Sequence, residues 1–320
     1  MSGSSLPRIL LLALLSCIGA AHAAETTRTL RAGDTQLEIA VIGVDDPRRV
    51  DLLQDWIAEA AQAPLTVAGR FPLREARVEI RQRRSDDASP VPWGQTSRGD
   101  GVRVLLYVRD DASLDALRHD WTAVHELSHL FHSHLGERGR WLAEGLASYY
   151  QNVLRARIGL LTAEEAWTLL DAGFRRGQRA SATGPLDDLG RQRGGTMRVY
   201  WAGAAYWLEA DLALRREHDN SLDAVLGEYA RCCLHGTGEV APADFVAALD
   251  RIAGGDVFAR LYARYAVSTA FPPLDAAYGR LGIERDGDSL HFSHDRDARL
   301  RDAIMKRRRG APTKVSAAAD

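Results

Sequence analysis

The first third of the chain has a pattern of apolar and polar residues that predicts strands. Residues 35–42 and 78–82 alternate or are rich in β-branched residues, and the apolar run at 102–108 is a third candidate strand. Between the first two lies an amphipathic segment, residues 48–62, whose apolar residues fall on one helical face. Pro64 is expected to end this helix. Together these segments predict a small twisted sheet with helices on one side.

A predicted loop separates the strands from a helical second half of the chain. The polar, proline-containing residues 84–101 are expected to form a surface loop that borders a cleft. Later segments carry apolar residues at helical spacing, at residues 162–175, 198–216, 221–232, 242–252 and 256–265. The sequence therefore predicts an α+β protein in which a sheet precedes a set of helices.

The N-terminus has the pattern of a secretory signal peptide. Arg8 precedes a short apolar run, and small residues follow it up to Ala23. We expect residues 1–24 to be removed and the mature protein to be exported, either periplasmic or secreted. No later run reaches the length of a transmembrane helix, so no stable membrane insertion is expected. The alternative is a lipoprotein in which Cys17 is the lipidated residue.

Composition and charge exclude some classes of partner. The 320 residues carry a formal charge of −2, which gives no reason to expect nucleic acid as a partner. Residues 295–320 are charge-dense and are expected to form a solvated, partly disordered tail, with a basic patch for surface anchoring as the alternative. The adjacent Cys232 and Cys233 are expected to be a buried apolar pair, because a disulfide between neighbours strains the intervening peptide.

The candidate metal ligands and the candidate catalytic base begin at residues 125–129, which read His-Glu-Leu-Ser-His. In a helix, four residues advance by about 6 Å and turn by about 400°, which places His125 and His129 on one face. Both rings can then reach one ion at roughly 2.0–2.1 Å. Glu126 lies about 100° around the helix, where it reaches a water more readily than the ion. It is the candidate general base.

A catalytic zinc needs a third protein ligand and an open position. The metzincin pattern is excluded, because His132 stands where that pattern has glycine. We expect His132 to lie in the pocket wall or in solvent. Glu144 is the favoured third ligand, since Gly136 and Gly139 break the first helix and let a second one run back antiparallel.

A resemblance to a known family rests on these residues. Residues 141–147 read Trp-Leu-Ala-Glu-Gly-Leu-Ala. With residues 125–129 they resemble the gluzincin metallopeptidases of the aminopeptidase N and glycyl aminopeptidase branches, whose third zinc ligand is the glutamate of a W-L-x-E-G motif. The spacer in the aminopeptidase N branch is longer by about four residues, roughly one helical turn. The chain is therefore divergent from that branch.

The resemblance implies a fold and a cofactor. It implies one Zn²⁺ per chain, held by His125, His129 and Glu144. It also implies a thermolysin-like zincin, in which a small twisted sheet lobe carries the zinc-binding helix and a mainly helical lobe follows. In this chain the first lobe would span residues 25–135 and the second, with the third ligand, residues 136–294.

A second element supports the resemblance. Residues 199–203 read Val-Tyr-Trp-Ala-Gly and resemble the downstream Y-x-K-G element, whose tyrosine stabilises the oxyanion of the tetrahedral intermediate. Tyr200 would then be the electrophilic partner. Ala202 replaces the lysine of the family. The alternative is that Tyr200 packs in a helix, as Tyr206 and Trp207 are expected to do.

One element of the aminopeptidases is missing. The aminopeptidase N type uses a G-x-M-E-N segment, whose acidic residue grips the free amine of the substrate. Residues 94–96, Gly-Gln-Thr, occupy roughly the corresponding place without a carboxylate. An exopeptidase preference is therefore not implied, and endopeptidase activity or a narrow specificity stays open.

The expected function is that of an exported zinc-dependent metallopeptidase acting on a peptide or protein. Glu126 takes a proton from the attacking water and returns it to the leaving amine, while Tyr200 helps to hold the oxyanion. Ser148 is expected to orient Glu144. The alternatives are a zinc hydrolase with a non-peptide substrate and a non-catalytic binding or assembly factor on a peptidase scaffold.

Overall fold

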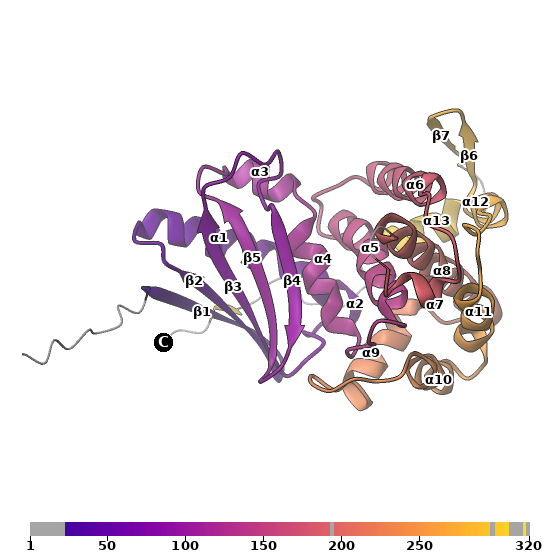
Figure 1. The fold of residues 1–320 in the computed structure, drawn as a ribbon, viewed down its shortest axis with the longest axis horizontal. Helices are drawn as coiled ribbons and strands as arrows, with labels where there is room; N and C mark the ends of the chain where they lie inside the picture. The colour runs from indigo at the N-terminus through magenta and orange to yellow at the C-terminus, as the bar shows by residue number, and fades with distance from the viewer. Residues whose placement is uncertain (1–22, 193–194, 295–297, 307–315, 318–320) are drawn as a thin grey trace, which may run out of the picture.

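A β-sheet and a set of helices lie side by side in this protein. The structure is a computed structural model that describes residues 23–192, 195–294, 298–306 and 316–317. The sheet lies on the left of Figure 1, in indigo to purple, and the helical remainder on the right, in pink to yellow. The fold is therefore of the α+β class. Residues 1–22 of the expected signal peptide, with Cys17, lie outside the described residues.

The sheet has parallel strands at its centre and antiparallel strands at its edges. Its order is β4-β5-β3-β2-β1-β8, in which β2, β3 and β5 are parallel and the other pairings are antiparallel. The bounds are β1 Glu25–Ala32, β2 Thr35–Ile42, β3 Glu75–Arg83, β4 Trp93–Arg98, β5 Val102–Arg109 and β8 Ser316–Ala317. The strands predicted at residues 35–42, 78–82 and 102–108 are confirmed as β2, part of β3 and β5.

Helices cover one face of the sheet, and charged residues cover the other. Buried residues alternate along the central strands, such as Ile39, Val78 and Val104, and face the helices. Glu79 and Arg103 lie on the opposite face and form an ion pair at 3.2 Å. Helices α1 Pro47–Ala60 and α4 Thr122–Ser128 contact the strands, and α2 Gln62–Ala68 and α3 Leu114–His119 pack against these helices. This alternation explains why the strands were readable from the sequence.

Two predictions for this part of the chain are wrong. Pro64 does not end a helix. It is the third residue of α2, where its missing N–H has no intrahelical partner to lose. Residues 84–101 are not entirely a loop, because Trp93–Arg98 forms β4, antiparallel to β5 at the edge of the sheet. None of the residues of β4 is fully buried, so the strand lacks the apolar alternation by which strands are recognised.

The rest of the chain is mainly helical. The segments predicted at residues 162–175, 198–216, 221–232, 242–252 and 256–265 are confirmed as helices. The bounds are α5 Arg140–Arg157, α6 Ala163–Arg179, α7 Leu186–Leu189, α8 Thr196–Glu217, α9 Leu222–Cys232, α10 Pro242–Ala253, α11 Val257–Ala266 and α12 Asp275–Leu281, followed by the hairpin of β6 Ile283–Asp286 and β7 Ser289–Phe292.

Part of the expected tail is ordered against the helices. Residues Ala298–Met305 form α13, in which Ile304 and Met305 are buried. The buried guanidinium of Arg157 donates to the carbonyl oxygen of Ile304 from Nε at 2.9 Å and from Nη2 at 2.7 Å. The charge density of this segment concealed the apolar face that packs here. The expected tail therefore includes one ordered helix, α13, and residues 295–297, 307–315 and 318–320 lie outside the described residues.

The two adjacent cysteines differ from the prediction as well. Cys232 and Cys233 form a disulfide with each other at the end of α9, and Cys232 is exposed. Cys233 has already left the helical conformation, with φ −139° and ψ −11°. The bond thus forms where the chain departs from the helix, and the prediction of a buried apolar pair is wrong.

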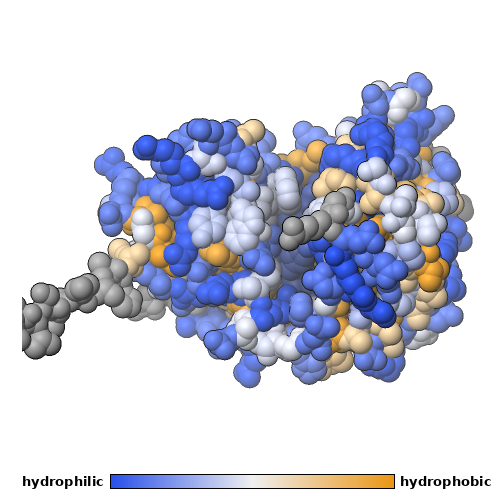
Figure 2. Space-filling model, in the orientation of Figure 1, coloured by the Kyte–Doolittle hydropathy of each residue, from blue (hydrophilic) through white to orange (hydrophobic). Residues whose placement is uncertain are grey.

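The visible surface is mostly hydrophilic. In Figure 2 apolar residues occur on it only in scattered patches. Among the described residues, no helix combines the length and the apolar character needed to cross a bilayer.

Helices α5 and α8 approach each other closely through two glycines. A Cβ atom on Gly203 would lie 2.8 Å from the Cα of Gly145 and would overlap the carbonyl oxygen of Trp141. Trp207 reinforces the contact, because its Nε1 donates to the carbonyl oxygen of Leu142 at 2.8 Å. Glu144 is next to Gly145, and Tyr200 lies three residues before Gly203. The contact therefore brings two candidate site residues together.

Replacing Gly203 by alanine is expected to destabilise the protein by at least about 1–3 kcal/mol, because the added methyl group forces the helices apart. The matched control is Gly279→Ala in α12, where an added Cβ meets no atom within 4 Å. In that helix alanine is expected to be neutral or stabilising. Urea denaturation of both variants measures the free energy of unfolding. Equal stability of the two variants would contradict the close approach.

Candidate metal centre

Helix α4 holds His125 and Glu126 inside the protein. The helix begins where Asp120 Oδ1 accepts a hydrogen bond from the main-chain N–H of Thr122 at 2.7 Å, which satisfies one free amide of the first turn. All seven residues of α4 are buried, since the helix packs against β4, β5 and α5. Side chains that are charged or polar in such a place require specific partners.

The helical conformation ends earlier than the sequence pattern predicts. After α4 the chain makes one 3₁₀ turn, η1 (His129–Phe131), and His132 is already extended. Arg98 Nη2 donates to the carbonyl oxygens of His129 and His132, at 2.6 Å each. These carbonyls therefore bind the guanidinium instead of continuing the helix. Gly139 does not break the first helix but is the N-cap residue of α5.

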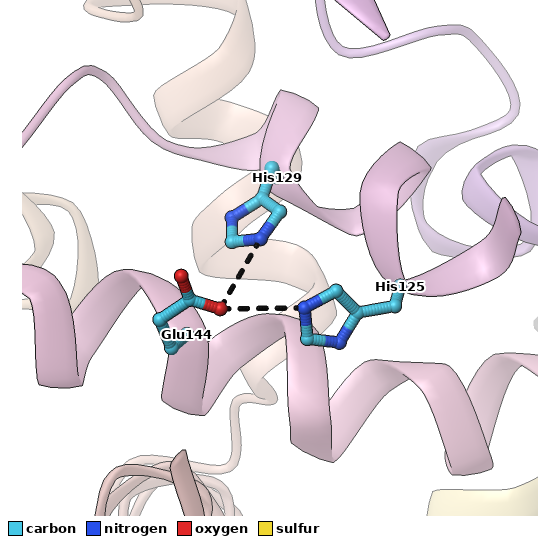
Figure 3. Close-up of side chains that lie close together, drawn as sticks. All are labelled: His125, His129 and Glu144. Carbon is cyan, nitrogen blue, oxygen red and sulfur yellow. Dashed lines mark hydrogen bonds and ion pairs between the residues drawn. The ribbon is translucent and has the colours of Figure 1, made fainter. Parts of the chain in front are cut away.

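Helix α5 brings Glu144 to the two histidines (Figure 3). Glu144 Oε2 lies 3.3 Å from His125 Nε2 and 3.6 Å from His129 Nε2. All three ligand atoms lie within 4.8 Å of one another, and the described part of the chain holds no other such group of three. These separations suit a single ion with ligands at about 2.0–2.2 Å. The structure thus assembles the three residues that the sequence singled out as ligands.

Glu144 and the histidines beside it shift the pKa values of one another. Burial favours the neutral acid of Glu144, but hydrogen bonds from His125 and His129 outweigh burial and hold the pKa of that carboxyl well below its usual range. Burial likewise opposes a charge on His125, while contacts with Glu144, Glu126 and Gln151 raise its pKa above the ordinary value. A carboxylate that stays ionised between two imidazoles is a donor set that fits zinc.

Gln151 fixes the orientation of His125. The amide Oε1 of Gln151 lies 2.8 Å from His125 Nδ1 and can only accept, so Nδ1 carries a hydrogen. This leaves Nε2, which faces Glu144, as the nitrogen available to a metal. A partner of this kind orients a metal ligand and raises its basicity.

His132 fixes the orientation of His129 in the same way. The carbonyl oxygen of Ser133 accepts from His132 Nδ1 at 2.7 Å. Burial, with the nearby charges of Arg98 and His129, lowers the pKa of His132 well below its ordinary value, so its other nitrogen is an acceptor. That nitrogen, Nε2, lies 2.9 Å from His129 Nδ1, which therefore donates. His132 thus lies behind a ligand, and neither the pocket wall nor solvent describes its place.

Glu126 lies beside this group with partners of its own. The hydroxyl oxygen of Thr96 is 2.8 Å from Glu126 Oε2 and 3.0 Å from its carbonyl oxygen. Gly94 permits this approach of β4, because a Cβ there would lie 2.7 Å from Thr122 Cγ2 and 2.9 Å from Glu126 Cγ. The carboxylate is therefore held in place but is not one of the three clustered ligands. A carboxylate that adjoins a set of metal ligands without belonging to it is available to act as a base.

Tyr200 reaches the same site from α8. Its ring stacks on that of His125, with centroids 5.9 Å apart and planes at 20°. Burial, and then the charge of Glu144, raise the pKa of Tyr200 above its ordinary value, so the hydroxyl keeps its proton and can donate. Arg140 lies on the ring, with its guanidinium carbon 5.9 Å from the centroid. Tyr200 therefore lies at the candidate metal centre, although Ala202 departs from the family element.

The sequence pattern missed or misassigned several supporting residues. Ser148 does not orient Glu144, because its hydroxyl has no hydrogen-bond partner among the described residues. Gln151 supports His125 instead, and its spacing of seven residues from Glu144, two helical turns on the same face, is a signal that could have identified it. Thr96 and Arg98 could not be identified in this way, because the sequence of their strand, β4, resembles that of a loop.

Comparisons with known proteins agree with this architecture. No family model matches the sequence, and no curated protein sequence matches it. Among solved structures, the chain is similar to the aminopeptidase N family protein of Idiomarina loihiensis, with 14% identity and a TM-score of 0.60 over 81% of this chain and 49% of that one. It is also similar to a two-domain M1 zinc metallopeptidase bound to L-arginine, with 15% identity and a TM-score of 0.50 over 79% of this chain and 54% of that one.

At such identities the likeness is one of fold, and the chain spans about half the length of these two proteins. Over that part, the chain has a fold similar to that of an aminopeptidase N family protein and of an M1 zinc metallopeptidase.

Proposed function

We propose that the protein is an exported zinc metallopeptidase of the thermolysin-like zincin type, acting on a peptide or protein. One Zn²⁺ per chain is held by His125, His129 and Glu144, Glu126 is the general base, and Tyr200 is the donor to the oxyanion. The observation that carries this proposal is the convergence of the three ligand atoms within 4.8 Å. The similarity of fold supports it, and export rests on the signal-peptide pattern of residues 1–24.

The donor set supports zinc as the metal. Two imidazole nitrogens and one carboxylate oxygen are a usual set of protein ligands in a catalytic zinc site. When bound, zinc polarises the scissile carbonyl and lowers the pKa of water towards about 7. Gln151 and His132 keep the two imidazoles in the orientation that directs Nε2 at the ion.

The reaction is then divided between two side chains. Glu126 accepts the proton of the attacking water through the carboxylate that Thr96 holds, and it later delivers that proton to the leaving nitrogen. Tyr200 donates its hydroxyl hydrogen to the oxygen that becomes negatively charged in the tetrahedral intermediate. Its raised pKa keeps that hydrogen in place. The bond that breaks is the peptide C–N bond, and the products are a carboxylate and an amine.

Metal analysis and peptide cleavage test the proposal together. Purified protein is expected to contain about one zinc per chain, as mass spectrometry of the metal content measures, and to cleave members of a peptide library. Removal of zinc by a chelator should abolish cleavage, and added zinc should restore it. Protein without zinc would contradict the metal site. Hydrolysis of ester or epoxide substrates without cleavage of any peptide would identify a non-peptide hydrolase.

Replacing Tyr200 by phenylalanine is expected to lower kcat by about 10²–10³-fold with little change in KM, since the hydroxyl acts on the oxyanion and not on the bound substrate. The zinc content should stay at the wild-type level. Tyr107→Phe is the matched control, because Tyr107 lies on the outer face of the sheet, away from the metal centre. A kcat for Tyr200→Phe equal to that of the control would remove Tyr200 from the mechanism.

A further inference from the structure

A pocket of about 310 Å³ opens beside the metal centre between α4, α5, α6 and α8. We call it the Trp121 pocket. Its apolar walls come from Trp121, Leu169, Met197 and Trp201. The volume lies at the lower end of the range for ligand sites, so the pocket accommodates one large side chain and not a longer segment.

The pocket adjoins the metal ligands directly. Three of its lining residues contact His125. Gln151 accepts from its Nδ1 at 2.8 Å, while the rings of Trp121 and Tyr200 lie 5.2 and 5.9 Å from its ring, centroid to centroid. A peptide advances at most about 3.3–3.6 Å per residue. A side chain that enters the pocket therefore comes from a residue close to the scissile bond.

Exposed apolar side chains gather at this pocket. Trp121 is 44% exposed, and Leu169 and Met197 are each 40% exposed. In the described chain, only Trp93 and Val267 are further large apolar side chains with comparable exposure. Apolar residues that stay exposed together next to a site are typical of a surface that binds an apolar group.

The charged residues that line the pocket are both arginines, and the carboxylates whose charges act on Arg155, those of Asp120 and Glu165, are not among the lining residues. Arg155 and Arg176 line it, and no carboxylate does. Arg155 is 4% exposed and donates to the carbonyl oxygen of His119, but no described carboxylate forms an ion pair with it. Arg176 lies over the ring of Trp201 at 4.9 Å. A lysine or arginine side chain entering the pocket would lose water and meet charges of its own sign.

We propose that the Trp121 pocket selects substrates with a large apolar side chain, aromatic or long aliphatic, at a residue flanking the scissile bond, and rejects lysine and arginine there. This inference rests on the proposed peptidase function and names its substrate class. The apolar walls bind the apolar side chain, and Arg155 and Arg176 disfavour a lysine or arginine side chain.

The first test compares peptides that differ only at the residues flanking the scissile bond. Phenylalanine or leucine in the preferred position is expected to give a kcat/KM at least about tenfold higher than lysine. Leu169→Glu should lower this ratio by about tenfold, because it places a carboxylate in the apolar wall. The matched control is Thr168→Glu, which adds the same charge to the neighbouring, exposed position of α6 outside the pocket. The control should keep the wild-type ratio.

The second test measures binding without turnover. Phenylalanine and lysine peptides are titrated into Glu126→Gln protein, with tryptophan fluorescence as the signal, because Trp121 and Trp201 line the pocket. Tighter binding of the phenylalanine peptide, lost in the Glu126→Gln, Leu169→Glu double variant, is expected.

The outcomes separate the two proposals. One result is cleavage that depends on Glu126 but not on the flanking residue, and another is cleavage that favours glutamate or lysine there. Either result overturns the proposed role of the Trp121 pocket and leaves the proposed peptidase function standing. If no peptide is cleaved, the proposed function fails, and the fluorescence titration still decides whether the pocket prefers an apolar side chain.

Discussion

Replacing Glu126 by glutamine is expected to lower kcat for peptide hydrolysis by about 10²–10⁴-fold, the contribution typical of a general base. Glutamine has nearly the same shape and still offers an oxygen to the hydroxyl of Thr96, which lies 2.8 Å from the carboxylate. It cannot take a proton from water. Since Glu126 is not among the three clustered ligands, the zinc content should not change.

The measurement is steady-state cleavage of a peptide substrate alongside metal analysis of the same samples. Glu284→Gln is the matched control, because Glu284 is exposed on the β6 strand. It should have wild-type activity. A Glu126→Gln protein that retains zinc and cleaves peptides at the control rate would rule out Glu126 as the base.

Glu144→Gln is expected to abolish stable zinc binding, and with it peptide cleavage. The substitution removes the carboxylate that lies 3.3 and 3.6 Å from the two imidazoles and leaves only two good ligands. Loss of a supporting residue alone typically costs 10–100-fold in affinity for the metal, so the loss of a ligand should exceed about 100-fold. Zinc titration with a fluorescent competitor measures this affinity.

Comparing wild-type protein, Gln151→Leu and Glu144→Gln tests the prediction for Glu144 more closely. Gln151→Leu removes only the hydrogen-bond partner of His125 and should weaken zinc binding by about 10–100-fold. Zinc should also raise the thermal midpoint of wild-type protein, because a ligand that binds only the folded state stabilises it. That shift should shrink in Gln151→Leu and vanish in Glu144→Gln. Equal zinc affinity in all three proteins would place the metal elsewhere.

The elements with a regular apolar pattern were predictable from the sequence. β2 was recovered at its observed bounds because one of its faces is buried against helices. β4 was missed because it is an edge strand with no fully buried residue, and α13 because its charges masked three buried apolar side chains. The disulfide was missed because it depends on how the chain leaves α9, a local geometry that residue types do not reveal.

Some residues of the candidate site were likewise predictable from the sequence, and others were not. His125, His129 and Glu144 were identifiable because helical spacing and a returning helix constrain where their side chains meet. The supporting contacts were not identifiable, since they depend on tertiary packing. His132 lies four residues beyond the end of α4, a helix that the pattern extended too far, and its position depends on Arg98, which belongs to the missed strand.

The glycine contact between α5 and α8 also bears on metal binding. Gly145 and Gly203 set the distance between the helices that carry Glu144 and Tyr200, whereas His125 and His129 belong to α4 and η1, which follow the sheet. An ion bound by His125, His129 and Glu144 would therefore connect α5 to the chain that follows the sheet. Metal affinity and the packing of α5 would then be thermodynamically linked, so a substitution that loosens this packing far from the ion is expected to weaken metal binding as well.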